Sequence, residues 1–248
     1  MDCVKEIENR VAFIKEIVEN AHAKGIVLGL SGGKDSALAG ILCKMACENT
    51  LGLIMPCGTE VNYSQDMTDA LALAEKFSIK TKVVDLAPAK NELVKAMEGS
   101  FVLDEEATSN MNPRLRMTAL YAVARQEGMV VAGTGNACER YVGYFTKWGD
   151  GACDFNPIGD MMVSEIYELL EYLGCPENII KKAPSAGLKI GQTDEYELGV
   201  TYKQIQYYLQ YGPSALDKGA TKLIDSLHER NLHKLEPVPI YSREDKGE

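Results

Sequence analysis

One short stretch most constrains how this chain can fold: Gly29-Leu30-Ser31-Gly32-Gly33-Lys34-Asp35-Ser36. It follows an apolar run at 25–28 and precedes another at 37–42, which predicts a buried strand, a tight glycine turn and the start of a helix. Glycines let the backbone approach a ligand closely, and the N–H groups at a helix start lack partners within the helix. Because the helix dipole also favours negative charge there, the stretch predicts an anion-binding turn.

Two common glycine motifs do not match this stretch. A Walker A loop would need a glycine at position 28 and a hydroxyl residue at position 35, where this chain has Leu28 and Asp35. A Gly-x-Gly-x-x-Gly fingerprint is also missing from the sequence. The remaining pattern, Ser-Gly-Gly-x-Asp-Ser, resembles the pyrophosphate loop of the ATP pyrophosphatases, which cleave ATP between the α- and β-phosphates. The alternative is an ordinary glycine-rich turn between a strand and a helix.

Apolar runs alternate with helical patterns along the chain. We expect strands at about 25–30, 51–56, 81–85 and 129–132. Helices are expected at about 2–22, from the glycine loop to 48, and at 64–77, 88–98, 112–127, 164–173, 201–210 and 214–231. This order predicts an α/β fold, with a doubly wound parallel sheet flanked by helices in a single domain over residues 1–248. The polar interval at 104–110 is expected to be mobile, and loops are expected at 145–160 and around 192–195.

The composition of the chain indicates its cellular compartment and limits the kinds of partner that it is expected to bind. Lys and Arg number 26 and Asp and Glu 36, so the net charge is −10, which disfavours binding to nucleic acid or to an anionic membrane. The charged amino terminus does not resemble a signal peptide, and no apolar run is long enough to cross a membrane. None of the seven cysteines forms a Cys-x-x-Cys pair. We therefore expect a cytoplasmic protein with reduced thiols.

The first and fourth strands end in small polar residues, at 31–33 and 133–135. In open α/β sheets, ligands bind beyond the carboxyl ends of strands near a switch in strand order, so both ends should face one pocket. Asp35 in a phosphate site calls for a cation, and magnesium takes carboxylate and phosphate oxygens. Glu139 is the best placed second carboxylate, although an acid in the first turn of a helix is common for other reasons.

The downstream order of motifs resembles one family, the ammonia-dependent NAD synthetases of the ATP pyrophosphatase superfamily. Its markers follow the glycine loop in order: Asn112-Pro113-Arg114-Leu115-Arg116-Met117, Gly133-Thr134 with Glu139, Lys147-Trp148-Gly149-Asp150, Asn156-Pro157, Pro184-Ser185-Ala186, Gln192-Thr193-Asp194-Glu195 with Leu198-Gly199, and His233-Lys234. The resemblance covers nearly the full chain.

By position, the resemblance implies the following site residues: Gly29, Leu30, Ser31, Gly32, Gly33, Lys34, Asp35, Ser36, Thr134 and Ser185 for ATP, Asp35 and Glu139 for magnesium and catalysis, and Arg114, Lys147, Asp154, His233 and Lys234 for deamido-NAD. It implies that the pyridine carboxylate attacks the α-phosphate of ATP and releases pyrophosphate. Ammonia then displaces AMP from the acyl adenylate to give NAD. A homodimer is also implied, to which the opening helix could contribute.

Two positions depart from the family pattern. Val163 stands where a lysine that touches ATP is common, and Gly187 stands where an aspartate is usual. Lys181 or Lys189 could supply the missing charge. Two other functions stay open at this point: a tRNA-modifying ATP pyrophosphatase, and a nucleotide-binding α/β module without turnover.

Overall fold

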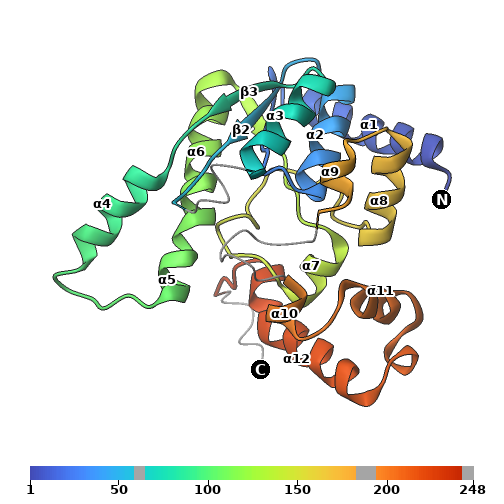
Figure 1. The fold of residues 1–248 in the computed structure, drawn as a ribbon. Coiled ribbons are helices and arrows are strands. Elements are labelled where there is room, and N and C mark those ends of the chain that lie inside the picture. Colours follow the sequence, from blue (N-terminus) through green and yellow to red (C-terminus); the bar gives the residue numbers. More distant parts are fainter. Residues whose placement is uncertain (59–64, 183–193, 242–248) are drawn as a thin grey trace.

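A computed structural model describes residues 1–58, 65–182 and 194–241 of this chain. Its centre is a parallel sheet in the order β3-β2-β1-β4 (Figure 1). The four strands are β1 (Gly25–Gly29), β2 (Thr50–Ile54), β3 (Lys80–Val83) and β4 (Met129–Val131). The order reverses at β1, because the chain moves outward to β2 and β3 and then returns to pair β4 with β1. This is the switch in strand order predicted from the sequence.

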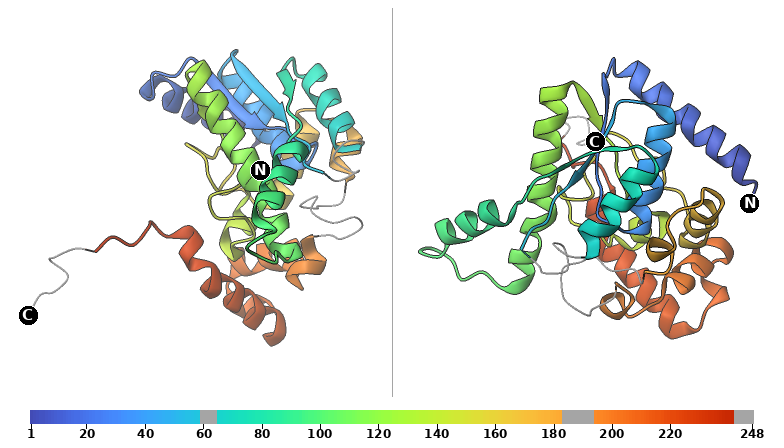
Figure 2. Two further views of the ribbon diagram at one scale, coloured as in Figure 1. Left: turned by 90° about the vertical axis from the view of Figure 1, so that its left-hand side faces the viewer. Right: turned by 45° about the horizontal axis from the view of Figure 1, so that its top comes forward.

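The sheet separates two apolar layers. Figure 2 shows the sheet and its flanking helices from two further sides. Ile26 and Leu28 of β1 belong to a cluster with residues of α1, α2, α3, α8 and α9, whereas Val27 between them packs with β2, β4 and α6 on the opposite face. This alternation follows from the period of two residues in a strand. Helices on both faces confirm the predicted doubly wound α/β class.

The helices have these bounds: α1 (Cys3–Asn20), α2 (Lys34–Ala46), α3 (Met67–Lys76), α4 (Ala87–Met97), α5 (Glu105–Ser109), α6 (Met111–Glu127), α7 (Ala137–Val142), α8 (Val163–Tyr172), α9 (Glu177–Ile180), α10 (Asp194–Leu198), α11 (Tyr202–Tyr211), the 3-10 helix η2 (Pro213–Ala215) and α12 (Lys218–Leu235). A third apolar cluster joins α7, α11 and α12 at the lower side of Figure 1. It also includes Val163 from the start of α8 and Leu198 from α10.

The interval at 104–110 holds the short helix α5, because Asp104 caps it by accepting a hydrogen bond from the Ala107 N–H at 2.7 Å, and its mobility stays a prediction. Two other expectations about local structure were wrong. Asp194 and Glu195 begin the helix α10 instead of continuing a loop. Helix α12 continues past residue 231 to Leu235, so His233 and Lys234 lie in its last turn.

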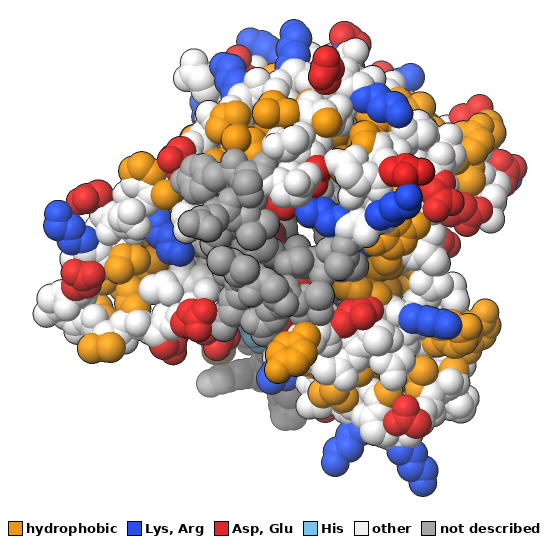
Figure 3. Space-filling view, in the orientation of Figure 1, with side chains coloured by type: hydrophobic (Ala, Val, Ile, Leu, Met, Phe, Trp, Pro, Cys, Tyr) orange, Lys and Arg blue, Asp and Glu red, His pale blue; other side chains and the backbone are white. Residues whose placement is uncertain are grey.

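The opening helix α1 packs on its own chain, against α2 and α8. Within the part of the chain that the structure describes, no helix is long and apolar enough to span a bilayer. On the face drawn in Figure 3, acidic and basic side chains of the described residues are interspersed. That the chain does not bind nucleic acid stays a prediction from its net charge.

Candidate active site

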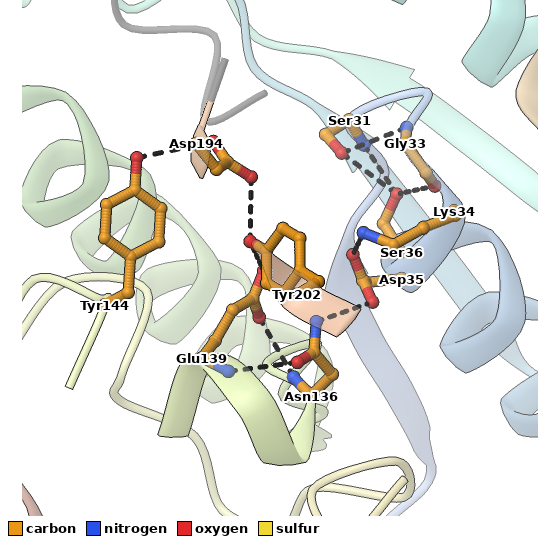
Figure 4. A network of polar contacts seen from close by, with 10 residues as sticks. All are labelled: Ser31, Gly33, Lys34, Asp35, Ser36, Asn136, Glu139, Tyr144, Asp194 and Tyr202. Atoms are coloured by element: carbon orange, nitrogen blue, oxygen red, sulfur yellow. Dashed lines mark hydrogen bonds and ion pairs between the residues drawn. The ribbon is translucent and has the colours of Figure 1, made fainter. Parts of the chain in front are cut away.

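The glycine loop is held by its two serines (Figure 4). The Ser36 hydroxyl donates to Gly33 O at 3.1 Å and accepts from the Ser31 N–H at 3.2 Å, and the two hydroxyl oxygens lie 3.0 Å apart. Helix α2 then starts at Lys34, and no side chain of the described residues caps it. The helix start therefore keeps the anion-binding character that the sequence predicts.

Gly32 fixes the loop against the start of α3. Its φ is +76°, and a Cβ there would lie 2.3 Å from Asp66 O. Beside it, the Lys182 ammonium lies 3.4 Å from Gly32 O, 2.7 Å from Asp66 Oδ1 and 2.8 Å from Asp69 Oδ2. Asp69 is only 1% exposed and also accepts from Asn178 at 2.6 Å. This buried group ties α3 and the segment after α9 to the glycine loop.

A side-chain hydrogen bond joins the segments that follow β1 and β4. Asn136, which follows β4, donates its side-chain amide to Asp35 Oδ1 at 3.1 Å. Asn136 also caps α7, because its Oδ1 accepts the Glu139 N–H at 3.0 Å while Glu139 Oε2 accepts the Asn136 N–H at 3.0 Å. Glu139 is thus a helix-capping acid, as the alternative interpretation had it, and it also faces Asp35 across the site.

The two carboxylates share a buried electrostatic environment. Burial and the Asp35 charge raise the pKa of Glu139 to about 8. The Lys34 ammonium lies 2.7 Å from Asp35 Oδ2 and partly offsets this charge. Two carboxylates in a site with too little positive charge fit a magnesium ion, which is commonly held by one or two carboxylates together with phosphates and water. Among the described residues, no cluster of three or more His, Cys, Asp or Glu would enclose a metal without such help.

Tyr202 joins this site to α10. Its hydroxyl donates to Asp194 Oδ2 at 2.9 Å and lies 3.4 Å from Glu139 Oε1. Tyr144 donates to the other oxygen of Asp194, at 3.3 Å (Figure 4). Burial and the charges of Glu139 and Asp194 hold the pKa of Tyr202 far above its usual value, so its hydroxyl stays protonated and can donate.

Four of the five predicted dinucleotide residues line the same cleft: Arg114, Lys147, His233 and Lys234. The Arg114 guanidinium lies 3.4 Å from Lys147 O, and the Lys147 ammonium donates to His233 O. Lys234 donates to Gly143 O at 2.7 Å and to Phe145 O at 2.9 Å. The last turn of α12 therefore contacts the loop after α7, although more than eighty residues separate the two in the sequence.

A cavity of about 1410 Å³ joins the glycine loop to the basic residues Arg114, Lys147 and Lys234. Its lining includes most of the predicted residues: Gly29, Leu30, Ser31, Gly33, Lys34, Asp35, Ser36, Arg114, Thr134, Glu139, Lys147, His233 and Lys234. Pockets for a single small molecule usually have about 300–1,000 Å³, so this cleft has room for more than one nucleotide.

Two of the predicted residues, Gly32 and Asp154, do not line the cavity. Gly32 is not part of the lining, because it packs on Asp66. Asp154 also stays outside the lining, and its carboxylate accepts from the Val131 N–H at 2.7 Å and from the Tyr121 hydroxyl at 3.1 Å. Ser185 and Gly187 lie outside the described residues. Their predicted roles stay predictions.

The structure describes one of the two positions that depart from the family pattern, Val163, and one of the two lysines expected to supply the missing charge, Lys181. Val163 is 8% exposed and belongs to the apolar cluster of α7, α11 and α12. Lys181 points to an exposed pair with Glu177, whereas its neighbour Lys182 lines the cleft. Lys189 lies outside the described residues. A lysine does approach the loop, but from a position that the sequence reasoning did not consider.

Comparisons with known proteins agree on one family. The model of a family described as NAD synthase matches residues 6–238. The NH(3)-dependent NAD(+) synthetase of Carboxydothermus hydrogenoformans is 43% identical over 236 residues, which is 93% of this chain and 94% of that protein. The corresponding protein of Archaeoglobus fulgidus is 40% identical over 250 residues, 97% of each chain.

Solved structures extend this similarity to the fold. A structure described as NMN synthetase from Francisella tularensis superposes with a TM-score of 0.91 at 38% identity, over 97% of this chain and 99% of that chain. The NH3-dependent NAD synthetase from Campylobacter jejuni superposes with a TM-score of 0.80 at 33% identity, over 98% and 100% of the two chains.

Proposed function

This chain belongs to the NAD synthase family, and we propose that it converts deamido-NAD into NAD with ATP and ammonia. The observation that carries the proposal is the single cleft, whose lining combines the glycine loop and the two carboxylates Asp35 and Glu139 with the basic residues Arg114, Lys147 and Lys234. The glycine loop suits the phosphates of ATP, and the basic residues suit the phosphates of a dinucleotide.

The parts of the site have different roles in the proposed reaction. Helix α2 and the backbone of the glycine loop bind the polyphosphate, and the pyridine carboxylate attacks the α-phosphate to release pyrophosphate. Ammonia then attacks the acyl adenylate and AMP leaves. Because both substrates are held in one cleft, much of the barrier is overcome by their alignment, and the loop N–H groups stabilise the charge that develops on the phosphates.

We further propose that Asp35 and Glu139 hold a magnesium ion. The ion would neutralise charge on the transferring and departing phosphates. The proposal is supported by the raised pKa of Glu139, which burial and the charge of Asp35 cause, because a cation between the two carboxylates would offset both effects. Asn136 and Tyr202 orient the two carboxylates from opposite sides.

The remaining expectations belong to the same proposal. All seven cysteines are free, which supports a reducing, cytoplasmic setting. The homodimer and the source of the ammonia stay predictions. Helix α1 leaves Val4 and Phe13 half exposed, so it could contribute to a subunit contact.

A second substrate calls for a direct comparison, because the Francisella tularensis structure is described as an NMN synthetase. The same chemistry on nicotinate mononucleotide would give NMN. The basic residues of the cleft do not separate the two substrates, since a mononucleotide and a dinucleotide both carry a phosphate beside the nicotinate riboside.

The test is an assay of purified protein with magnesium, ATP, ammonium and either acid substrate. We expect amide, AMP and pyrophosphate in equal amounts, with the higher kcat/KM for deamido-NAD. A higher kcat/KM for nicotinate mononucleotide would reassign the substrate but keep the chemistry, whereas ADP and phosphate as products would overturn the mechanism. Asp35→Ala should abolish turnover.

A further inference from the structure

Lys34 is a buried charge inside the proposed metal site. Its side chain is only 5% exposed, and its ammonium lies 2.7 Å from Asp35 Oδ2. The same nitrogen lies 5.3 Å from the centroid of the Tyr202 ring, on which a cation is favourably placed. Figure 4 shows the ammonium directed at Asp35, on the side of that carboxylate that Asn136 leaves open. Since little solvent reaches it, its charge must be balanced within the site.

The balance comes from the two carboxylates. Asp35 Oδ2 lies 2.7 Å from the ammonium. Glu139 lines the same cavity, and Asn136 contacts both acids, through its side-chain amide at Asp35 Oδ1 and its backbone N–H at Glu139 Oε2. The ammonium therefore takes the place that a divalent ion would have beside the two carboxylates.

We propose that the Lys34 ammonium is a built-in counter-cation of the Asp35–Glu139 pair, and that a divalent ion must displace it from Asp35 in order to bind. The proposal rests on the metal site of the proposed function. A divalent ion on Asp35 would otherwise stand within a few ångströms of another positive charge, and like charges at such distances in a buried site repel strongly.

The binding of ATP removes the competition between the Lys34 ammonium and the divalent ion for Asp35. The polyphosphate brings several negative charges to the glycine loop, and these can accept both the ion and the displaced ammonium. The divalent ion should therefore bind weakly to the protein alone and much more tightly together with ATP. Lys34 thereby links metal binding to the arrival of the nucleotide.

The experiment measures Mn²⁺ binding to the full chain without nucleotide, by electron paramagnetic resonance. We expect Lys34→Met, which has a similar length and no charge, to bind Mn²⁺ at least about tenfold more tightly than the wild type, because the repulsion is gone. Lys34→Arg keeps the charge and should match the wild type within about threefold. Equal affinities of the wild type and Lys34→Met would overturn the proposal.

Two controls keep the outcomes distinct. Asp35→Asn should remove Mn²⁺ binding in both backgrounds. Binding that survives it would overturn the metal site and the counter-cation together, whereas loss of binding combined with equal affinities of the wild type and Lys34→Met would overturn the counter-cation alone. The melting temperature gives a second measurement: Mn²⁺ should raise it more in Lys34→Met than in the wild type, and Lys34→Gln serves if the methionine variant does not fold.

Discussion

Asn136 donates its side-chain amide to Asp35 Oδ1 at 3.1 Å, and this bond joins the start of α7 to the first turn of α2. The same side chain caps α7 through its carbonyl oxygen, which accepts the Glu139 N–H at 3.0 Å. One fully buried asparagine thus sets the direction of both proposed metal carboxylates. Its two functions use different atoms, so they can be separated by mutation.

We expect Asn136→Ser to keep most of the stability and to lose at least about tenfold in kcat, because serine can still cap a helix but cannot reach Asp35. Asn136→Ala should lose the same activity and also about 1 kcal/mol of unfolding free energy. Asp2→Ala is the matched control, since Asp2 caps α1 by accepting the Lys5 N–H at 3.2 Å. It should cost stability only. A Ser variant with wild-type kcat would contradict the positioning role.

Gly32→Ala tests the seating of the glycine loop on α3. The new Cβ would lie 2.3 Å from Asp66 O in a backbone with φ +76°, so we expect a loss of at least about 2 kcal/mol in unfolding free energy and weaker ATP binding. Thermal unfolding and calorimetric titration with an ATP analogue measure the two effects. Gly99→Ala is the control, because a Cβ at that position would have no heavy atom of the described residues within 4 Å. Equal melting temperatures for the two variants would disprove the clash.

The strands and the glycine loop could be predicted because their causes are local. Residues 25–28 form an uninterrupted apolar run, as buried parallel strands do, and Gly32 and Gly33 mark the turn that follows. Helix α5 carried a signal too: Asp104 stands before two glutamates, which is typical of a capped helix start. The prediction of a mobile interval gave too little weight to that signal.

The long-range contacts have no local signal in the amino-acid sequence. Lys182 reaches Gly32 across 150 positions, and Tyr202 reaches Glu139 across 63. Lys181 and Lys182 are neighbours of the same type, and only the direction of the chain after α9 decides that the second one enters the cleft. For such residues, the order of motifs along the chain indicated a site but could not indicate which side chains support it.

Tyr202→Phe tests the link between α10 and Glu139. Removing the hydroxyl takes the donor from Asp194 Oδ2 and the polar neighbour from Glu139 Oε1, so we expect kcat to fall about tenfold and unfolding free energy to fall by about 1–3 kcal/mol. Tyr172→Phe, at an exposed position of α8, should leave both unchanged. Steady-state kinetics and urea unfolding measure these effects. If kcat stayed at the wild-type value while stability fell, the hydroxyl would have a structural role alone.

Asp69→Asn tests the buried group behind the glycine loop. Asp69 is 1% exposed and accepts from Lys182, Asn178 and Gln65, so the loss of its charge should cost about 1–3 kcal/mol of unfolding free energy. Glu177→Gln is the control: it breaks the exposed Lys181 pair on the neighbouring helix and should cost less than about 0.5 kcal/mol. Urea unfolding of both variants at neutral pH makes the comparison. Equal costs would show that Asp69 contributes no more than a surface charge.

The difference in unfolding free energy between the wild type and Asp69→Asn should depend on pH if the charge of Asp69 is its source. Burial would raise the pKa of Asp69, but the hydrogen bonds from Lys182, Gln65 and Asn178 together hold it below the ordinary aspartate value of 3.8. A group whose pKa is lower in the folded state stabilises the fold above its unfolded pKa and loses this contribution as pH falls through the folded value. The gap between wild type and Asp69→Asn should therefore be constant from pH 5 to about 7 and shrink below about pH 4. A gap that stays constant down to the acid limit of folding would assign the effect to packing.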